Sequence, residues 1–427
     1  MIIHVVTEGE TLTQISQKYD ISISQLIRQN EITNPDNLIP GQDIIIEYTA
    51  ITYTVEPGDT LFSIAELYHV TVIELLQNNP NLILNTTLYE GQTIVIEYND
   101  EKIGRMTTVG YAYPYIDRDT LLLTLPYLTY LTLFTYGFNT DGTLIPIEDT
   151  ELIQLARDYG VAPLMLISTL NKEGVFSNAL AHELLTSEEM QDSLLQNILT
   201  NIKEKNYYGL DIDFEFVYPE DREAFAAFVN KASTLLNAEG YPVFIALVPK
   251  TSAEQVGELY EAHDYAALGA AANMVLLMTY EWGYTYGPPM AVAPINNVRR
   301  VIEYGLTEIP SEKILMGIPN YGYDWPLPYE RGVTKARTLG NVEALNLAIS
   351  YNVPIKFDPI SQSPTYTYIS SDGVEHEVWF ENARSIEAKI RLIPEYDIHG
   401  ASWWNIMKWF PQNWVVVNAL MEINKVL

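Results

Sequence analysis

The chain has 427 residues, of which 48% are hydrophobic and 19% charged, a length that suggests roughly two to four domains. Its 24 Lys and Arg residues against 55 Asp and Glu residues give a formal net charge of −31, which argues against nucleic acid and anionic membrane surfaces as partners. The absence of cysteine excludes disulfides, thiolate catalysis and cysteine-ligated zinc. The six histidines show no metal-ligand spacing, so we expect neither a metal nor another cofactor.

The N-terminal segment MIIHVVTEGETLTQ has no basic start and no sustained apolar stretch, so we expect no standard signal peptide. The most apolar window, residues 265–278, is too short and too rich in alanine to span a bilayer. We therefore expect a soluble protein that does not insert into a membrane.

The first hundred residues contain an internal repeat. Residues 4–30, HVVTEGETLTQISQKYDISISQLIRQN, align with residues 53–79, YTVEPGDTLFSIAELYHVTVIELLQNN. Each copy closes on a β-branched segment after a Gly-Gln turn, LIPGQDIIIEY in the first and LYEGQTIVIEY in the second. Each unit should therefore fold as strand, helix, helix, strand, with Thr11 or Thr60 capping the first helix.

The repeats resemble the lysin motif (LysM), a small βααβ module that binds glycans containing N-acetylglucosamine. We place them at residues 1–48 and 51–98, followed by a polar linker at 99–106. The resemblance implies that they contact glycan through loops rather than through charge; two modules that serve only as spacers are the alternative. The implied contact residues are Gly9, Thr11, Leu12, Gly58, Asp59, Thr60 and Leu61.

From residue 107 to residue 427, apolar β-runs alternate with helical patterns. Eight candidate strands over this length favour an α/β fold of the (β/α)₈ TIM-barrel type with an insertion, and a doubly wound open sheet is the alternative. The candidate strands are Thr108–Tyr113, Tyr130–Phe138, Ala162–Ser168, Gly209–Val217, Val243–Pro249, Met274–Tyr280, Ile314–Gly322 and Gly400–Asn405.

The fourth strand lies in YYGLDIDFEFVYPE, residues 207–220, and alternates acids with large apolar residues. The acids are Asp211, Asp213 and Glu215. The apolar residues are Ile212, Phe214 and Phe216. Strand alternation sends the two sets to opposite faces, so in a barrel the apolar set should face the helices and the acids should line the interior toward its C-terminal end. Crowded carboxylates cannot all ionise, so one is pushed toward the neutral form that a general acid needs.

The spacing of the three acids alone arises about once by chance in a chain of this composition. The surrounding residues must therefore show whether it marks a site. With a preceding glycine and the fourth place in the series, the stretch resembles the DGxDxDxE motif of glycoside hydrolase family 18. MTYEWGY (residues 278–284) resembles the family's Met-x-Tyr-acid element, and GASWWN (residues 400–405) resembles the element whose Trp floors the sugar site. Residues 324–398 look like the family's small α+β insertion. Two positions depart from the pattern: Tyr208 replaces the motif's first Asp, and Glu281 stands where the family often has Asp or Asn.

The resemblance implies a retaining mechanism in which the substrate's own acetamido oxygen is the nucleophile. Glu215 would protonate the departing glycosidic oxygen and then act as base on water. Asp213 would orient the acetamido N–H, Asp211 would tune Asp213, and Tyr280 would hold the acetamido carbonyl in line for attack.

The same resemblance implies an aromatic platform beneath the sugar. Trp404 is the candidate platform, with Trp403 as its rival. The other implied substrate contacts are Met278, Glu281 and Tyr111.

With its paired LysM modules, the chain resembles the bacterial group of spore-cortex-lytic N-acetylglucosaminidases. This implies hydrolysis of β-1,4 bonds after N-acetylglucosamine in peptidoglycan, by a monomer in the coat and cortex region of the spore, with the cell wall as the alternative location. A chitinase-type hydrolase and a non-catalytic glycan-binding protein are the alternative functions. We expect the repeats to hold the chain on its polymer while the barrel cleaves independently of them.

Overall fold

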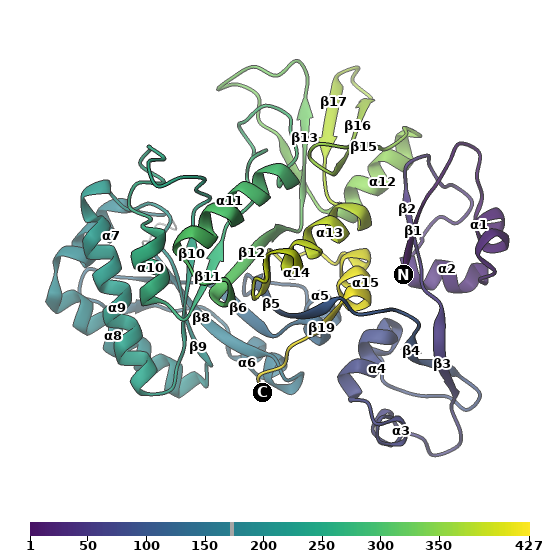
Figure 1. Ribbon diagram of the computed structural model, residues 1–427, viewed down its shortest axis with the longest axis horizontal. Helices are drawn as coiled ribbons and strands as arrows, with labels where there is room; N and C mark the ends of the chain where they lie inside the picture. Colours follow the sequence, from purple (N-terminus) through teal and green to yellow (C-terminus); the bar gives the residue numbers. More distant parts are fainter. Residues whose placement is uncertain (171–174) are drawn as a thin grey trace.

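The structure is a computed structural model that describes residues 1–170 and 175–427. In Figure 1 a barrel of strands and helices occupies the left and centre, a smaller sheet rises above it, and two small modules lie at the right. The elements of the first module are β1 (Ile2–Val5), α1 (Leu12–Tyr19), α2 (Ile23–Asn30) and β2 (Asp43–Ile46). Those of the second are β3 (Thr49–Thr54), α3 (Leu61–Tyr68), α4 (Val72–Asn78) and β4 (Thr93–Tyr98).

Both modules have the predicted βααβ order, with β1 antiparallel to β2 and β3 antiparallel to β4. Thr11 accepts a hydrogen bond from the backbone of Gln14, and Thr60 accepts one from Ser63. In each case the threonine backbone N–H donates in return to the side chain of the third residue, Gln14 or Ser63, and completes a capping box, which satisfies donors that a helix N-terminus leaves free. The predicted capping role of the two threonines is confirmed.

Eight parallel strands form the barrel, and β5 pairs with both β6 and β18, which closes the sheet. The predicted barrel is confirmed and the open-sheet alternative is wrong. The strands are β5 (Gly104–Ala112), β6 (Tyr130–Phe138), β8 (Ala162–Ser168), β9 (Gly209–Asp213), β10 (Val243–Leu247), β11 (Met274–Leu277), β12 (Ile314–Pro319) and β18 (Gly400–Trp404). Two short strands extend the sheet, β7 (Leu144–Ile145) and β19 (Met421–Ile423).

Several predicted strand ends differ from the observed ones. The fourth strand stops at Asp213 instead of Val217, and Phe216 is 39% exposed rather than turned toward the helices. Phe214 is fully buried against Phe225 and Phe228, so alternation holds for one residue past the strand and then fails. The first strand begins at Gly104, inside the segment expected to be linker.

Helices alternate with the barrel strands and cover them. They are α5 (Arg118–Thr124), α6 (Thr150–Asp158), α7 (Asn178–Thr186), α8 (Glu188–Lys205), α9 (Arg222–Ala238), α10 (Tyr265–Ala271), α11 (Ile295–Glu308), α13 (Ala383–Ile390), α14 (Leu392–Tyr396) and α15 (Pro411–Leu420). Short 3₁₀ helices are η1 (Pro80–Leu82), η2 (Leu125–Tyr127), η3 (Pro219–Asp221) and η4 (Ser311–Lys313). The longest, α8, starts at a Ser187 side-chain cap and stops at Asn206, whose left-handed φ of 63° ends it.

Between β12 and α13 the chain builds a five-stranded antiparallel sheet in the order β14-β13-β17-β16-β15. Its elements are β13 (Gly322–Pro326), β14 (Arg337–Leu339), α12 (Asn341–Tyr351), β15 (Lys356–Asp358), β16 (Ser363–Ile369) and β17 (Glu375–Trp379). We call this unit the insertion. After β17 the chain returns to the barrel as α13.

Both small modules pack against the rest of the chain. Leu75 and Leu76 of the second module belong to the same buried cluster as Tyr127 and Leu128 beside the barrel. Ile39 of the first module is fully buried in the core of the insertion. The linker expected between modules and barrel therefore does not keep them apart.

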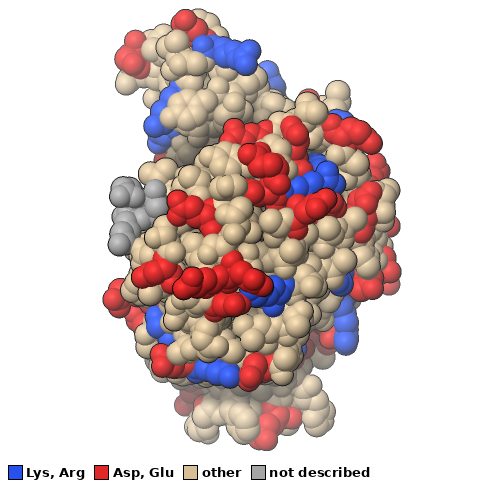
Figure 2. Space-filling view, turned by 90° about the vertical axis from the view of Figure 1, so that its left-hand side faces the viewer, with Lys and Arg blue, Asp and Glu red and all other residues tan. Residues whose placement is uncertain are grey.

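Within residues 1–170 and 175–427, none of the helices combines the length and the apolar character that crossing a bilayer requires. The same residues contain no group of three or more His, Asp or Glu side chains that could hold a metal ion. On the face shown in Figure 2, acidic side chains gather in several clusters with scattered basic side chains between them.

Candidate active site

The acid series lies at the C-terminal end of β9, with Asp211 and Asp213 in the strand and Glu215 two residues beyond it. Asp211 stands in register with Phe244 of β10 and Leu166 of β8, and both belong to the buried cluster that fills the barrel interior. Asp211 is fully buried and Asp213 is 4% exposed. The acids therefore point inward, as expected from strand alternation.

Burial gives these carboxyls unusual acidities. It raises the pKa of Asp211 to about 6, against the opposing effect of a hydrogen bond from Tyr111, whose hydroxyl lies 2.5 Å from Asp211 Oδ2. Burial, followed by the charges of Glu215 and Asp211, raises the pKa of Asp213 well above its usual range. Burial and then the negative charge of Glu281 raise the pKa of Glu215 to about 6.

Two carboxylate oxygens in this series have no internal partner. Asp211 Oδ1 and Asp213 Oδ1 are buried and find no hydrogen-bond partner among the described residues. An unpaired buried carboxylate oxygen is costly unless it is protonated or meets a donor. Asp213 Oδ1 in particular is left without a partner in the part of the chain that the structure describes, beside Glu215 and Tyr280.

Sequence reasoning missed His263, which supports the backbone at Glu215. The imidazole is fully buried, and its Nε2 lies 3.1 Å from the Glu215 carbonyl oxygen. Burial lowers the pKa of His263 to about 4, so the ring is neutral and Nε2 carries the proton it donates. A lone His in EAHDY gives no periodicity or spacing signal by which it could have been found.

Tyr280 follows β11 and is 6% exposed. Gly317 makes room for its ring, because a Cβ at that position would lie 2.6 Å from Tyr280 Cε1. Burial, then the charges of Asp213 and Glu215, raise the pKa of Tyr280 well above 10.0. The phenol therefore stays protonated and can donate a hydrogen bond beside the acids.

Glu281 has a left-handed φ of 62°, and two tyrosines hold its carboxylate. The Tyr321 hydroxyl donates to Glu281 Oε1, and the Tyr323 hydroxyl donates to the same oxygen over 3.0 Å. Burial raises the pKa of Glu281, while the two hydrogen bonds lower it. The sequence placed Glu281 in the site but gave no sign of either tyrosine.

The two candidate platform tryptophans lie on opposite faces of β18. Trp404 meets the inward-facing rings of Tyr111 and Phe134, with centroids 5.8 Å and 4.9 Å away. Trp403 is fully buried among the helices, where its Nε1 donates to Asn413 Oδ1 over 2.8 Å. Trp403 is therefore closed to a sugar, and Trp404 alone remains a candidate platform.

Met278 and Tyr208 are half-buried at the edge of the interior cluster. Tyr208 packs on Tyr130, with ring centroids 5.7 Å apart. The position of the missing Asp is thus filled by an aromatic contact, and the acid series begins at Asp211.

In the small modules, the predicted glycan contacts shape the turn before α1 or α3. Gly9 and Gly58 are exposed and have φ of 73° and 94°, which glycine adopts without strain. Asp59 accepts hydrogen bonds from Tyr53 and the Glu56 backbone, both over 2.8 Å. The remaining predicted contacts are helix caps, Thr11 and Thr60, and buried core residues, Leu12 and Leu61.

Comparison with known proteins covers the whole chain. The glycosyl hydrolases family 18 model matches residues 107–408, and the LysM domain model matches residues 4–47 and 53–97. The cortical fragment-lytic enzyme of Bacillus subtilis (strain 168) is 40% identical over 432 residues, covering 100% of this chain and 99% of that protein. That of Bacillus anthracis is 36% identical, covering 99% and 100%. The crystal structure of the Bacillus cereus spore cortex-lytic enzyme SleL matches with a TM-score of 0.84 at 35% identity, covering 99% and 98%.

Proposed function

Because the chain belongs to glycosyl hydrolases family 18 and carries two LysM domains, we propose that it cleaves the β-1,4 bonds after N-acetylglucosamine in spore-cortex peptidoglycan. It is a glycoside hydrolase. The observation that carries the proposal is the acid series at the C-terminal end of β9, with Asp211 and Asp213 buried and Glu215 half-buried, beside Tyr280.

Glu215 is the proposed general acid and base. A pKa of about 6 keeps roughly 9% of Glu215 protonated at pH 7, far more than an ordinary glutamate would be, which suits proton donation to the departing glycosidic oxygen. After departure the same carboxylate can take a proton from water. His263 fixes the backbone from which this side chain projects.

The substrate's acetamido oxygen is the proposed nucleophile. The unpaired Asp213 Oδ1 can accept the acetamido N–H, and the neutral Tyr280 hydroxyl can donate to the acetamido carbonyl. Asp211, tied to Tyr111, raises the pKa of Asp213 through its charge. Holding both ends of the acetamido group sets its oxygen in line with the anomeric carbon, which is a large part of such catalysis.

Trp404 is the proposed platform beneath the sugar, since its ring belongs to the inward-facing aromatic group with Tyr111 and Phe134. Tyr111, Met278 and Glu281 are the other proposed substrate contacts. The LysM domains would hold the same polymer through the turns at Gly9 and Gly58.

Cortex peptidoglycan is favoured over chitin because full-length relatives are cortical fragment-lytic and spore cortex-lytic enzymes. We place the action of the chain in the spore on the same ground. Mass spectrometry of products from purified cortex peptidoglycan tests both points. We expect fragments with N-acetylglucosamine at the new reducing end, and none from the Glu215→Gln protein. Fragments ending in muramic residues, or faster turnover of chitin oligomers than of cortex, would overturn the proposal.

A further inference from the structure

We propose that the first LysM domain is a working part of the active site, because it holds in place the loop that follows the sugar platform Trp404. We call residues 405–410, between β18 and α15, the platform loop. The inference rests on the platform role proposed for Trp404. It assigns to residues of the first LysM domain a positioning role in hydrolysis, separate from glycan retention.

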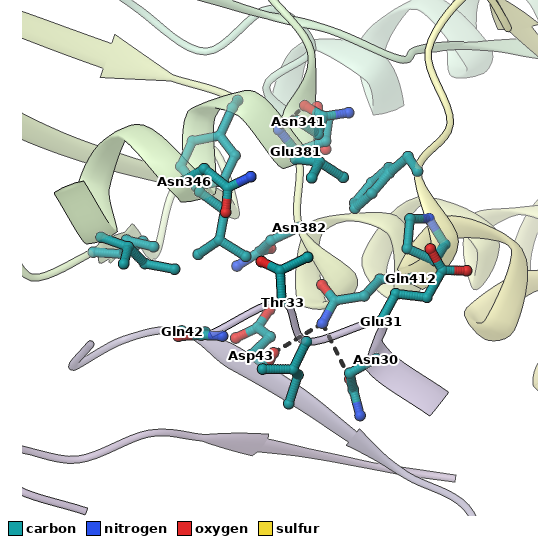
Figure 3. A pocket seen from close by; sticks show the side chains of 18 of the residues that line it. Asn30, Glu31, Thr33, Gln42, Asp43, Asn341, Asn346, Glu381, Asn382 and Gln412 are labelled. Atoms are coloured by element: carbon teal, nitrogen blue, oxygen red, sulfur yellow. Dashed lines mark hydrogen bonds between the residues drawn. The ribbon is translucent and has the colours of Figure 1, made fainter. Parts of the chain in front are cut away.

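The platform loop reaches the first LysM domain within five residues of Trp404. Trp409 Nε1 donates to both carboxylate oxygens of Glu31, over 3.0 and 3.1 Å. Just beyond the loop, Gln412 Nε2 donates to Asn30 Oδ1 over 3.2 Å and to the Asp43 carbonyl oxygen over 2.8 Å. Figure 3 shows Gln412 between these two partners, at a cavity of about 160 Å³ bounded by the LysM domain, the insertion and α15.

The domain is firmly seated on the insertion and α13. Asp43 Oδ1 accepts from Arg384 Nε over 2.7 Å, and its Oδ2 accepts from the Arg384 backbone in the first turn of α13. A carboxylate at a helix N-terminus is favourably placed. Ile355 donates its N–H to the Pro40 carbonyl over 2.9 Å, and Ile39 is fully buried in the insertion core.

The second LysM domain shows that the fold itself does not require these contacts. In the repeat alignment, Tyr89 stands where Ile39 is, and it is 63% exposed. Thr93 replaces Asp43 and is exposed, and Pro80 replaces Glu31. The first repeat thus differs from the second at positions that touch the insertion and the platform loop.

The barrel clamps the same loop from its other side. The Asn320 side-chain amide donates to the carbonyls of Asn405 and Lys408, over 3.0 and 2.8 Å, and the Ile406 N–H donates to the Tyr111 carbonyl over 2.9 Å. Because both the barrel and the first LysM domain hold the platform loop, loss of the LysM contacts alone should shift Trp404 without unfolding the loop. A shifted platform weakens sugar binding in the ground and transition states alike, so KM should rise more than kcat falls.

A matched pair of glycines tests the proposal. A Cβ at Gly41 would lie 1.8 Å from the Ile355 carbonyl oxygen, whereas a Cβ at the equivalent Gly91 would meet nothing within 4 Å. Their φ values are +87° and +80°, so alanine imposes similar local strain at both. Only Gly41→Ala also pushes the first domain off the insertion.

The assay uses the full chain and a short soluble N-acetylated glycan fragment. For Gly41→Ala we expect KM to rise about three- to tenfold with kcat within about twofold, and faster amide hydrogen exchange in residues 405–412. Gly91→Ala should leave both quantities at wild-type values. Trp409→Phe keeps a smaller aromatic ring and removes the donor to Glu31, so we expect about a twofold rise in KM with only a small fall in melting temperature.

Hydrogen exchange separates this inference from the proposed function, because it needs no turnover. If the wild type fails to release N-acetylglucosamine ends while Gly41→Ala still speeds exchange in residues 405–412, the proposed function fails and the coupling stands. Unchanged KM and unchanged exchange in both Gly41→Ala and Trp409→Phe would overturn the coupling. Equal effects of Gly41→Ala and Gly91→Ala would overturn it as well, since strain alone would then explain them.

Discussion

The charge of Glu281 should set part of the alkaline limit of activity. Its negative charge is, after burial, the second cause that raises the pKa of Glu215 to about 6. Glu281→Gln removes the charge but keeps an oxygen that can accept from Tyr321 and Tyr323. Without the charge, ionised Glu215 is less disfavoured, so its pKa falls. The general acid is then deprotonated at lower pH, and the alkaline limb of kcat/KM moves toward acid.

The magnitude follows from the two causes. At pH 7 a group with a pKa of about 6 is roughly 9% protonated, whereas at the ordinary value of 4.5 it would be about 0.3% protonated, a ratio of roughly thirtyfold. Burial is the larger cause, so Glu281 accounts for less than half of the rise. The variant should therefore lose less than about sixfold in kcat/KM at pH 7 through this route, and almost nothing below about pH 5.

The assay is kcat/KM on a soluble glycan fragment from about pH 4 to about pH 8, because this ratio reports the acidities of the free enzyme. Glu281 is also a proposed substrate contact, so the height of the profile can change; the position of the alkaline limb is the measurement. Glu220→Gln, which removes an exposed acid in η3, is the charge-matched control and should leave the limb in place. If the alkaline limb of the kcat/KM profile of Glu281→Gln stays at the wild-type pH or moves to higher pH, the electrostatic reasoning is refuted.

Three further outcomes follow from the site and the packing. Glu215→Gln should fold normally and lose about 10²–10⁴ in turnover, because it removes the proposed proton donor to the leaving oxygen; near-wild-type hydrolysis by the folded variant would contradict that role. Chemically deacetylated glycan should resist cleavage and a thiazoline analogue should inhibit, as a rate comparison and an inhibition assay would show; equal rates on both glycans would exclude the acetamido nucleophile. Removal of residues 1–98 should lower the melting temperature by several degrees, because it uncovers apolar surface beside Tyr127 and on the insertion; an unchanged melting temperature would contradict the packing argument.

The fold was largely accessible from the sequence because its strongest signals are local. Tyr130–Phe138 and Ala162–Ser168 were predicted at their observed bounds, since buried parallel strands read as continuous apolar runs. The error at β9 has a physical cause. Phe216 extends the apolar alternation of the sequence, but the ladder ends at Asp213 and the chain turns, so Phe216 faces solvent.

The sequence predicted the site residues only where a recognisable motif contains them. Asp211, Asp213 and Glu215 lie at one strand end, so strand alternation together with the motif resemblance placed them in one site. His263 lies in the loop before α10, and Tyr321 and Tyr323 lie where the chain enters the insertion. Nothing in their local sequence marks them as part of the site. Trp403 and Trp404 show the same limit, because adjacent positions in a strand face opposite ways and only the register of β18 decides which one faces the interior.

The contacts of the LysM domains with the barrel and the insertion were the feature least visible in the sequence. A repeat is recognised by what its copies share, and the shared residues build the module itself: the capping threonines, the glycine turns and the buried leucines. The contacts with the barrel and the insertion depend on residues the copies do not share, such as Ile39 against Tyr89 and Asp43 against Thr93. In an alignment of the two copies, these differences look like ordinary variation at surface positions. The sequence therefore predicted that the barrel cleaves independently of the modules, whereas both domains pack against the barrel and its insertion. In a chain built from copies, the positions where the copies differ are the place to look for what each copy contacts.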